Sequence, residues 1–326
     1  MSETTRTGFH RRRLLQGAAA GAVGAVAASA PTPASASASA ARTGGAAAGD
    51  VTFQWFGTSG WRIDTGTRTV LVDPYLTRFP TGLFSGTFDP RTELTTDEAL
   101  VAEHTGHPET VLVTHSHWDH FTDVPFIATT TATARIVGTE TTYHLLRAYG
   151  VEAARIVVVK GGEVLDFDGY TVEVVAGRHS RNAARGYFSP GTLHGPAIPP
   201  RPATIGDLPE GDTLAFHVTF DGGPSAFFMG ASDFSERDTT GLRPDVAMIA
   251  PPTSTSTHRY VPRLLTALGN PRTVVPVHWD DFETPLSQPP RRDPSVNWPA
   301  FLQQIRETSP ASRVVLPEYL TPYHFA

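Results

Sequence analysis

The chain has 326 residues, 40% of them hydrophobic, which is enough for one large globular domain with a sizeable core. Its formal net charge of −6 argues against a nucleic-acid partner, because nucleic-acid-binding proteins usually present a basic face. The chain has no cysteine, which excludes disulfides, thiolate metal ligands and a cysteine nucleophile, so any metal site must use histidine and carboxylate ligands.

The first 40 residues predict an export signal that is not part of the fold. Arg11, Arg12 and Arg13 precede two leucines and a weakly apolar Ala/Gly run, and Ala38-Ser39-Ala40 is a small-residue cleavage site. Paired arginines in this position resemble a twin-arginine signal, which implies passage through the twin-arginine export machinery and a secreted or extracytoplasmic location. The run is too poor in strongly apolar residues for a stable membrane anchor. Residues 41–50 are expected to be a linker, and 51–326 the folded domain.

Short apolar runs separated by turn residues predict many strands in the folded domain. We expect strands at 51–56, 60–63, 69–72, 111–113, 135–137, 155–159, 171–175, 214–220, 226–229, 246–249 and 273–277. We expect helices at 96–103, 139–148, 259–268 and 299–307. Two sets of strands with helices between them predict a layered α/β sandwich. Residues 181–213, rich in proline and glycine, are predicted to form a long loop that is either functional or disordered.

Four of the predicted strands run into side chains that can bind a metal. Because binding groups gather at the carboxyl ends of strands in α/β sheets, we expect these side chains to converge. They are five imidazoles and two carboxylates: His115, His117, Asp119, His120, His179, Asp233 and His278. Ligands of this kind favour zinc, with manganese or iron as alternatives.

The strongest part of this pattern is the run from His115 to His120. Three histidines and an aspartate lie within six residues, directly after an apolar run. Burying such a cluster without a metal would carry a heavy desolvation cost. The cluster therefore predicts a metal site by itself, whereas His179 or His278 alone would not.

The run Thr114-His115-Ser116-His117-Trp118-Asp119-His120 resembles the signature of the metallo-β-lactamase superfamily, and the resemblance extends in order over nearly the whole chain after residue 50. It implies a four-layer αββα sandwich that holds two divalent metal ions. By the resemblance, His115, His117 and His179 hold one metal; Asp119, His120 and His278 hold the other; and Asp233 bridges the two. Asp73, at the end of an early strand, is expected to orient a ligand histidine.

Two further segments resemble one branch of that superfamily. His179-Ser180-Arg181 and Val277-His278-Trp279-Asp280-Asp281-Phe282 are similar to the branch of ascorbate-phosphate lactonases and N-acyl-phosphatidylethanolamine phospholipase D. Those relatives often have glycine where this chain has Asp280. The lack of cysteine argues against the commonest class of true β-lactamases, and His117 replaces a glutamate of the flavodiiron proteins.

The function predicted from these features is hydrolysis of a lactone or phosphoester in a small molecule, by a hydroxide shared between two metals and oriented by Asp119. Arg181, Arg185 and His194 are candidates for binding an anionic group of the substrate. Two alternatives stay open, an iron-dependent oxidoreductase on the same fold and a non-catalytic metal-binding protein. The oligomeric state is not predicted.

Overall fold

The computed structural model describes residues 51–182 and 184–325. The predicted export signal (1–40) and linker (41–50) lie outside the described residues. No helix in the described part of the chain combines the length and the apolar character needed to cross a membrane.

The first sheet begins as an antiparallel meander and continues as parallel strands. Its strands lie in the order β15-β1-β2-β3-β4-β5-β6, and the pairs from β3 to β6 are parallel. All three residues of the central strand β4 are buried, as expected for a strand covered on both faces. The bounds are β1 (Thr52–Gly57), β2 (Gly60–Asp64), β3 (Thr69–Val72), β4 (Thr110–Leu112), β5 (Arg135–Gly138), β6 (Ile156–Val158) and β15 (Pro322–Tyr323).

The second sheet has the order β11-β8-β9-β10-β12-β13-β14, and β7 pairs with β8. The pairs β8–β9 and β9–β10 are antiparallel, whereas β10–β12, β12–β13 and β13–β14 are parallel. The bounds are β7 (Val164–Phe167), β8 (Tyr170–Arg178), β9 (Leu214–Phe220), β10 (Ser225–Met229), β11 (Asp233–Phe234), β12 (Val246–Ile249), β13 (Thr273–Pro276) and β14 (Arg313–Val314).

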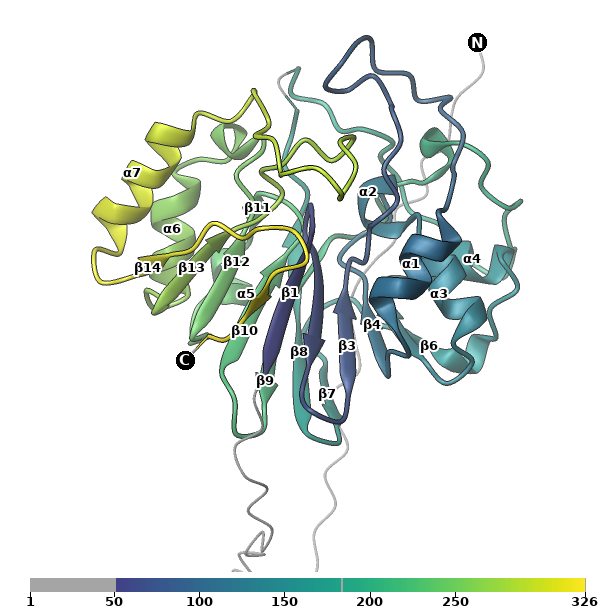
Figure 1. Ribbon diagram of the computed structural model, residues 1–326, viewed down its shortest axis with the longest axis horizontal. Coiled ribbons are helices and arrows are strands. Elements are labelled where there is room, and N and C mark those ends of the chain that lie inside the picture. The colour runs from purple at the N-terminus through teal and green to yellow at the C-terminus, as the bar shows by residue number, and fades with distance from the viewer. Residues whose placement is uncertain (1–50, 183, 326) are drawn as a thin grey trace, which may run out of the picture. The chain divides into compact units, whose positions relative to one another are not determined.

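Helices flank the pair of sheets on both sides (Figure 1). One group lies beside the first sheet: α1 (Glu98–Thr105), α2 (Trp118–Phe121), α3 (Val124–Thr130) and α4 (Glu140–Ala148). The other group lies beside the second sheet: α5 (Glu236–Thr239), α6 (Tyr260–Ala267) and α7 (Trp298–Thr308). Three short 3₁₀ helices complete the described elements: η1 (Ala153–Arg155), η2 (Ile205–Asp207) and η3 (Ser254–Ser256). The predicted αββα sandwich is confirmed.

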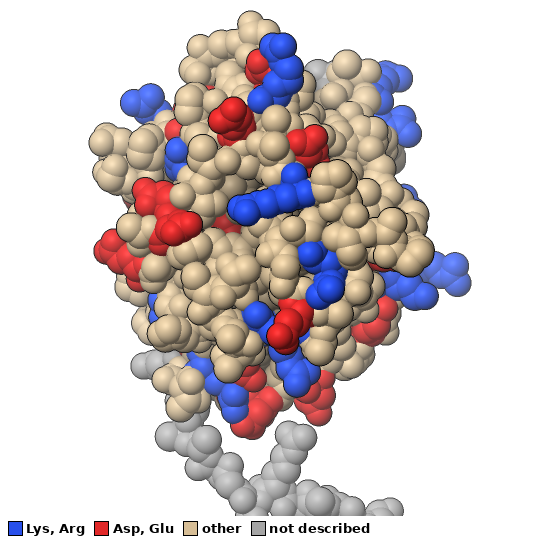
Figure 2. Space-filling view, turned by 90° about the vertical axis from the view of Figure 1, so that its right-hand side faces the viewer, with Lys and Arg blue, Asp and Glu red and all other residues tan. Residues whose placement is uncertain are grey.

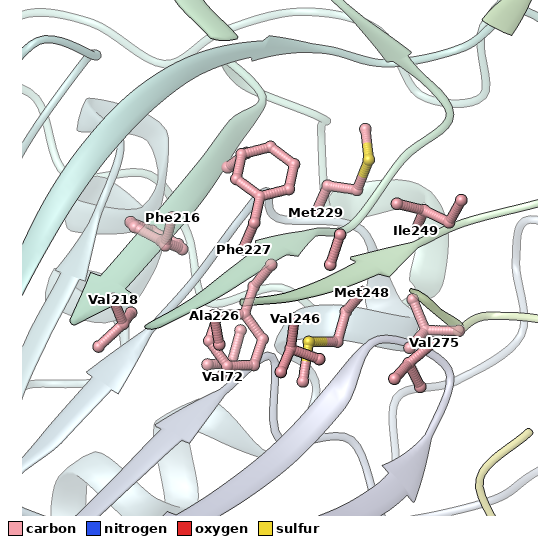
Figure 3. Close-up of a cluster of buried hydrophobic side chains, with 14 of the residues drawn as sticks. Val72, Phe216, Val218, Ala226, Phe227, Met229, Val246, Met248, Ile249 and Val275 are labelled. Carbon is pink, nitrogen blue, oxygen red and sulfur yellow. The ribbon is translucent and has the colours of Figure 1, made fainter. Parts of the chain in front are cut away.

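The main hydrophobic core lies between the two sheets. Val72 from the first sheet packs among Val218, Ala226 and Val246 from the second, and all four side chains are buried (Figure 3). A second core fills the space between the first sheet and its helices, and includes Val111. Because both faces of the first sheet are covered, its strand ends are held rigidly where the loops begin.

The predicted elements are present, with shifts of a few residues at their ends. The helix expected at 96–103 spans 98–105, because Asp97 caps it by accepting a hydrogen bond from the Leu100 amide. Among the described helices and strands, seven were not predicted, because each is too short for a clear period: α2, α3, α5, β7, β11, β14 and β15. The loop 181–213 is partly packed, since Ile205 and Leu208 are fully buried.

Figure 2 shows the face of the molecule formed by the helices of the first sheet. Acidic and basic side chains are interspersed over this face.

Candidate metal centre

Six of the seven predicted ligands come together in two groups of three. His115, His117 and His179 form one group, and in each group the ligand atoms lie within 4.8 Å of one another. The second group consists of Asp119, His120 and His278. The groups adjoin, because the ring centroids of His115 and His120 are 4.0 Å apart. Each of the two groups could hold a metal ion.

Local structure accounts for the positions of the first four ligands. His115 and His117 lie in the turn after β4, and His117 is the N-cap residue of α2. Asp119 and His120 lie on α2, whose four residues are all buried. A strand end followed at once by a helical turn brings these alternating ligands onto one surface.

Asp73 lies behind one ligand of the second group, His120. This fully buried carboxylate accepts hydrogen bonds from the Thr114 amide (2.7 Å), the Thr114 hydroxyl (2.6 Å) and His120 Nδ1 (2.8 Å). With its proton on Nδ1, His120 has its Nε2 lone pair free for a metal. Gly230 lies against this network, and a methyl group there would overlap the Thr114 hydroxyl.

Each histidine of the first group has one ring nitrogen engaged by the protein. His115 Nδ1 lies 3.1 Å from the Thr114 hydroxyl, His117 Nε2 lies 3.0 Å from the Phe188 carbonyl, and His179 Nδ1 lies 2.8 Å from the Ser180 carbonyl. His115 Nε2 is buried and has no partner within the protein. A buried nitrogen without a partner is costly, so the donor set fits a metal ion that this atom would bind.

The electrostatics of the site keep the three histidines of the first group and Asp119 in the protonation states that metals require. Burial lowers the pKa of His115 well below its ordinary value, and burial together with neighbouring His179 lowers the pKa of His117 to about 3. Burial opposes ionisation of Asp119, but His120 and His278 outweigh it and lower the pKa of that carboxyl. The first group is therefore neutral imidazole, and Asp119 is a carboxylate.

His278 is held at the centre by a left-handed backbone conformation and by hydrogen bonds that lead to the buried Asp280. Its φ of 57° is in the left-handed region, and its amide donates to the Thr58 carbonyl. The Thr58 amide in turn donates to Asp280 (2.9 Å), which is fully buried and also accepts from the Tyr319 hydroxyl (2.7 Å). Asp280 thus holds in place the loop that carries His278. Relatives in the lactonase branch named above often have glycine at this position. His278 Nε2 lies 3.0 Å from Asp119 Oδ2.

The structure does not bring Asp233 to the centre. It belongs to neither ligand group, and its Oδ1 accepts from the adjacent Phe234 amide. Strand β10 ends at Met229, and β11 pairs Asp233 with Arg178, which turns Asp233 toward a neighbouring cleft. Ala231 lines the cavity that contains the six ligands, and its side chain offers no ligand atom. The predicted bridging carboxylate is therefore missing from this arrangement.

The three predicted anion-binding residues do not line that cavity either. The guanidinium of Arg181 lies 5.8 Å from the Tyr187 ring centroid, and its Nε donates to the Tyr187 hydroxyl. Arg185 is exposed in a tight turn with a φ of 60°. His194 lies beside Glu140 on α4 (3.2 Å).

The ligands open into a cavity of about 610 Å³. Its wall includes Leu83, Phe84 and Phe88 from the segment between β3 and α1, and Phe282 beyond β13. The sequence predicts no role in the site for Leu83, Phe84 or Phe88, whereas Phe282 ends the run after Val277 that resembles one branch of the superfamily. The signal for the first three is an aromatic-rich stretch that is too rich in glycine for a core strand, in a connection much longer than its neighbours require.

Comparisons with known proteins agree with this geometry. Residues 52–278 match the model of the β-lactamase superfamily domain. A UPF0173 metal-dependent hydrolase of Salinibacter ruber is 29% identical over 237 residues, which cover 72% of this chain and 85% of that protein. A UPF0173 metal-dependent hydrolase of Halobacterium salinarum is 34% identical over 167 residues, 50% of this chain and 58% of that one.

A solved structure shares the fold. Igni18, a metallo hydrolase from Ignicoccus hospitalis, is 19% identical, with a TM-score of 0.55 and coverage of 85% of this chain and 98% of that one. The family model spans well over half of the chain and includes the two ligand groups. The chain therefore belongs to the metallo-β-lactamase superfamily of metal-dependent hydrolases.

Proposed function

We propose that this protein hydrolyses an ester-type bond, in a lactone or a phosphoester, at a centre of two divalent metals. The observation that carries the proposal is the pair of adjoining three-ligand groups at the bottom of a cavity large enough for a small molecule. Relatives named metal-dependent hydrolases support the reaction class. Zinc is the favoured metal, because imidazole and carboxylate ligands suit it.

Bound metals would supply Lewis-acid activation of both water and the electrophilic oxygen. The protein's own part is to hold the reactants. Asp119, with its lowered pKa, stays ionised, so its carboxylate can accept a hydrogen bond from the attacking water and aim the lone pair of that water at the electrophile. For an ester, water adds across the acyl carbon–oxygen bond and gives a carboxylic acid and an alcohol.

The test is a hydrolysis screen of the full-length chain loaded with zinc or manganese. Phosphodiesters, phosphomonoesters, lactones and β-lactams serve as substrates, and bound metal is quantified in the same samples. Asp119→Asn should lower the rate by about 100-fold or more with the fold retained. Full activity in that variant would remove the assigned role of Asp119, and no turnover of any substrate by metal-loaded protein would remove the proposed function.

We also propose that the protein is exported through the twin-arginine pathway. The support is the order of the N-terminal regions, with Arg11 and Arg12 before an apolar run and a small-residue cleavage site. This pathway carries folded proteins, so metals could be inserted before export. Replacing both arginines with lysine should retain the protein in the cytoplasm, as measured by cell fractionation, and unchanged secretion would contradict the proposal.

A further inference from the structure

One wall of the cavity is a continuous cluster of aromatic rings from four separate parts of the chain. Phe88 lies 5.1 Å from Phe188 and 5.8 Å from Trp118, centroid to centroid, and Trp118 lies 6.1 Å from Phe282. Phe84 packs edge-to-face on Phe282 at 4.9 Å. The Phe84–Phe282 and Phe88–Phe188 contacts are edge-to-face, which is a favourable geometry, and the two contacts of Trp118 are tilted. The rings therefore form a defined surface.

The aromatic wall begins at the metal ligands themselves. The ring of His117 lies 5.3 Å from that of Phe188, and the ring of His278 lies 5.1 Å from that of Phe282. A group bonded to the reacting atom would therefore leave the centre along an apolar surface. Leu83 and Tyr187 extend this surface to the rim, with 45% and 40% of their surface exposed. Large exposed apolar side chains grouped at a cavity mouth mark a binding surface.

The wall segments are also fastened to one another. The Glu283 carboxylate accepts hydrogen bonds from the Thr81 and Leu83 amides, both at 2.9 Å. This ties the segment that carries Phe84 to the loop that carries Phe282. The apolar wall is therefore already formed and needs no closure of a loop to assemble.

The charges around the cavity disfavour an anionic group away from the metals. Among the described residues that line the cavity, none is a lysine or an arginine. The lining carboxylate beyond the ligands is Asp293, which is buried and accepts a hydrogen bond from the Ser295 amide (2.7 Å). A second anion would lie near Asp293 without a basic side chain to offset the repulsion.

We propose that the substrate is an uncharged carboxylic ester or lactone, whose aromatic or long aliphatic substituent binds the wall formed by Phe84, Phe88, Phe188 and Phe282. This inference rests on the proposed function and specifies the substituent that its substrate carries. A phosphomonoester with a second anionic group is disfavoured, because the wall provides no basic partner for that group.

The test compares carboxylic substrates that differ in the length of the tail, with one phosphomonoester added to compare the bond type. The metal-loaded full-length chain is assayed with γ-lactones of four, six, eight and ten carbons, and with p-nitrophenyl butyrate, octanoate and phosphate. Each methylene that is fully buried should raise kcat/KM by about fourfold, so the ten-carbon lactone should exceed the four-carbon lactone by at least tenfold. Equal rates across the series, or preference for the phosphate, would overturn the inference. Either result would still be consistent with the proposed hydrolase function.

Phe88 is a half-exposed wall residue, so variants at this position should still fold. Phe88→Ser should reduce the dependence on tail length, and Phe88→Leu should restore most of it. Val164→Ser, at an exposed position on β7 outside the cavity, is the control and should behave like the parent protein. A Phe88→Ser variant that keeps the full tail dependence would contradict the assignment of the wall.

A binding measurement decides the inference even where no turnover is seen. Octanamide and butanamide are uncharged and differ by four methylenes, and each is titrated calorimetrically into the full-length chain. Octanamide should bind at least tenfold more tightly, and Phe88→Ser should remove most of that difference. Equal affinities would overturn the apolar wall, whereas absence of hydrolysis with the expected difference in affinity would refute the proposed function alone.

Discussion

Asp73 offers the sharpest test of how the protein prepares its ligands, through the isosteric change Asp73→Asn. The carboxylate accepts three hydrogen bonds, two from Thr114 and one from His120 Nδ1. An asparagine has one acceptor oxygen and would direct its NH₂ toward one of these donors. If it faces His120, the proton of that ring must move to Nε2, the nitrogen required by the metal.

The expected magnitude follows from the loss of one buried, charge-assisted hydrogen bond. Such a bond contributes about 1.5–3 kcal/mol, and loss of a carboxylate partner behind a ligand histidine lowers metal affinity about 10- to 100-fold. These two ranges agree, because a tenfold change corresponds to about 1.4 kcal/mol. The effect should be larger on the group of Asp119, His120 and His278, since Asp73 bonds His120 directly and reaches the other group only through the Thr114 hydroxyl beside His115.

The assay is a chelator competition titration with zinc or cobalt, read as two binding steps, together with urea unfolding of the metal-free chain. Asp245→Asn is the matched control, because this carboxylate accepts hydrogen bonds from Ser225 at the far end of the sheet. One step should weaken more than the other in Asp73→Asn, and neither step should weaken in Asp245→Asn. Equal weakening of both steps, or of neither, would refute the proposed division between the groups.

Three further predictions follow from the same geometry. Asp233→Asn should leave metal stoichiometry unchanged in elemental analysis, whereas Ala231→Asp should tighten binding of the more weakly held metal; a lost metal in Asp233→Asn would contradict the placement of that residue. Gly230→Ala should destabilise the protein by about 1–3 kcal/mol in urea unfolding, because the added methyl overlaps the Thr114 hydroxyl. Asp123 accepts hydrogen bonds from Leu76 and Thr77, yet burial outweighs them and raises its pKa to about 6. A carboxyl with a raised folded pKa loses stability as pH rises, by about 3 kcal/mol in all between pH 4 and pH 7. The metal-free Asp123→Asn variant should lose that part of the slope relative to the parent chain, and an identical slope would show that Asp123 does not titrate in this window.

The sequence alone was sufficient for the parts of this protein that depend on local pattern. The cluster from His115 to His120 is contiguous, so the sequence predicts a metal site there without knowledge of the fold. Apolar runs predicted the main strands, and therefore the edge where His179 and His278 would join the cluster. Asp73 was expected from the resemblance alone, and in the structure its carboxylate accepts a hydrogen bond from His120 Nδ1.

Only the tertiary structure decided which loop side chains reach the metal centre and the cavity, because this depends on the direction that each loop takes. Ala231 and Asp233 are two residues apart beyond β10, and the antiparallel pairing of β11 with β8 determines which of them lies at the centre. The aromatic wall is assembled from segments distant in sequence, such as those carrying Phe88 and Phe282. Arg181, although it follows a ligand closely, lies outside the cavity beside Tyr187. Hydrophobic periodicity reports burial along one element, whereas the direction of a loop side chain depends on contacts between elements, which no local pattern contains.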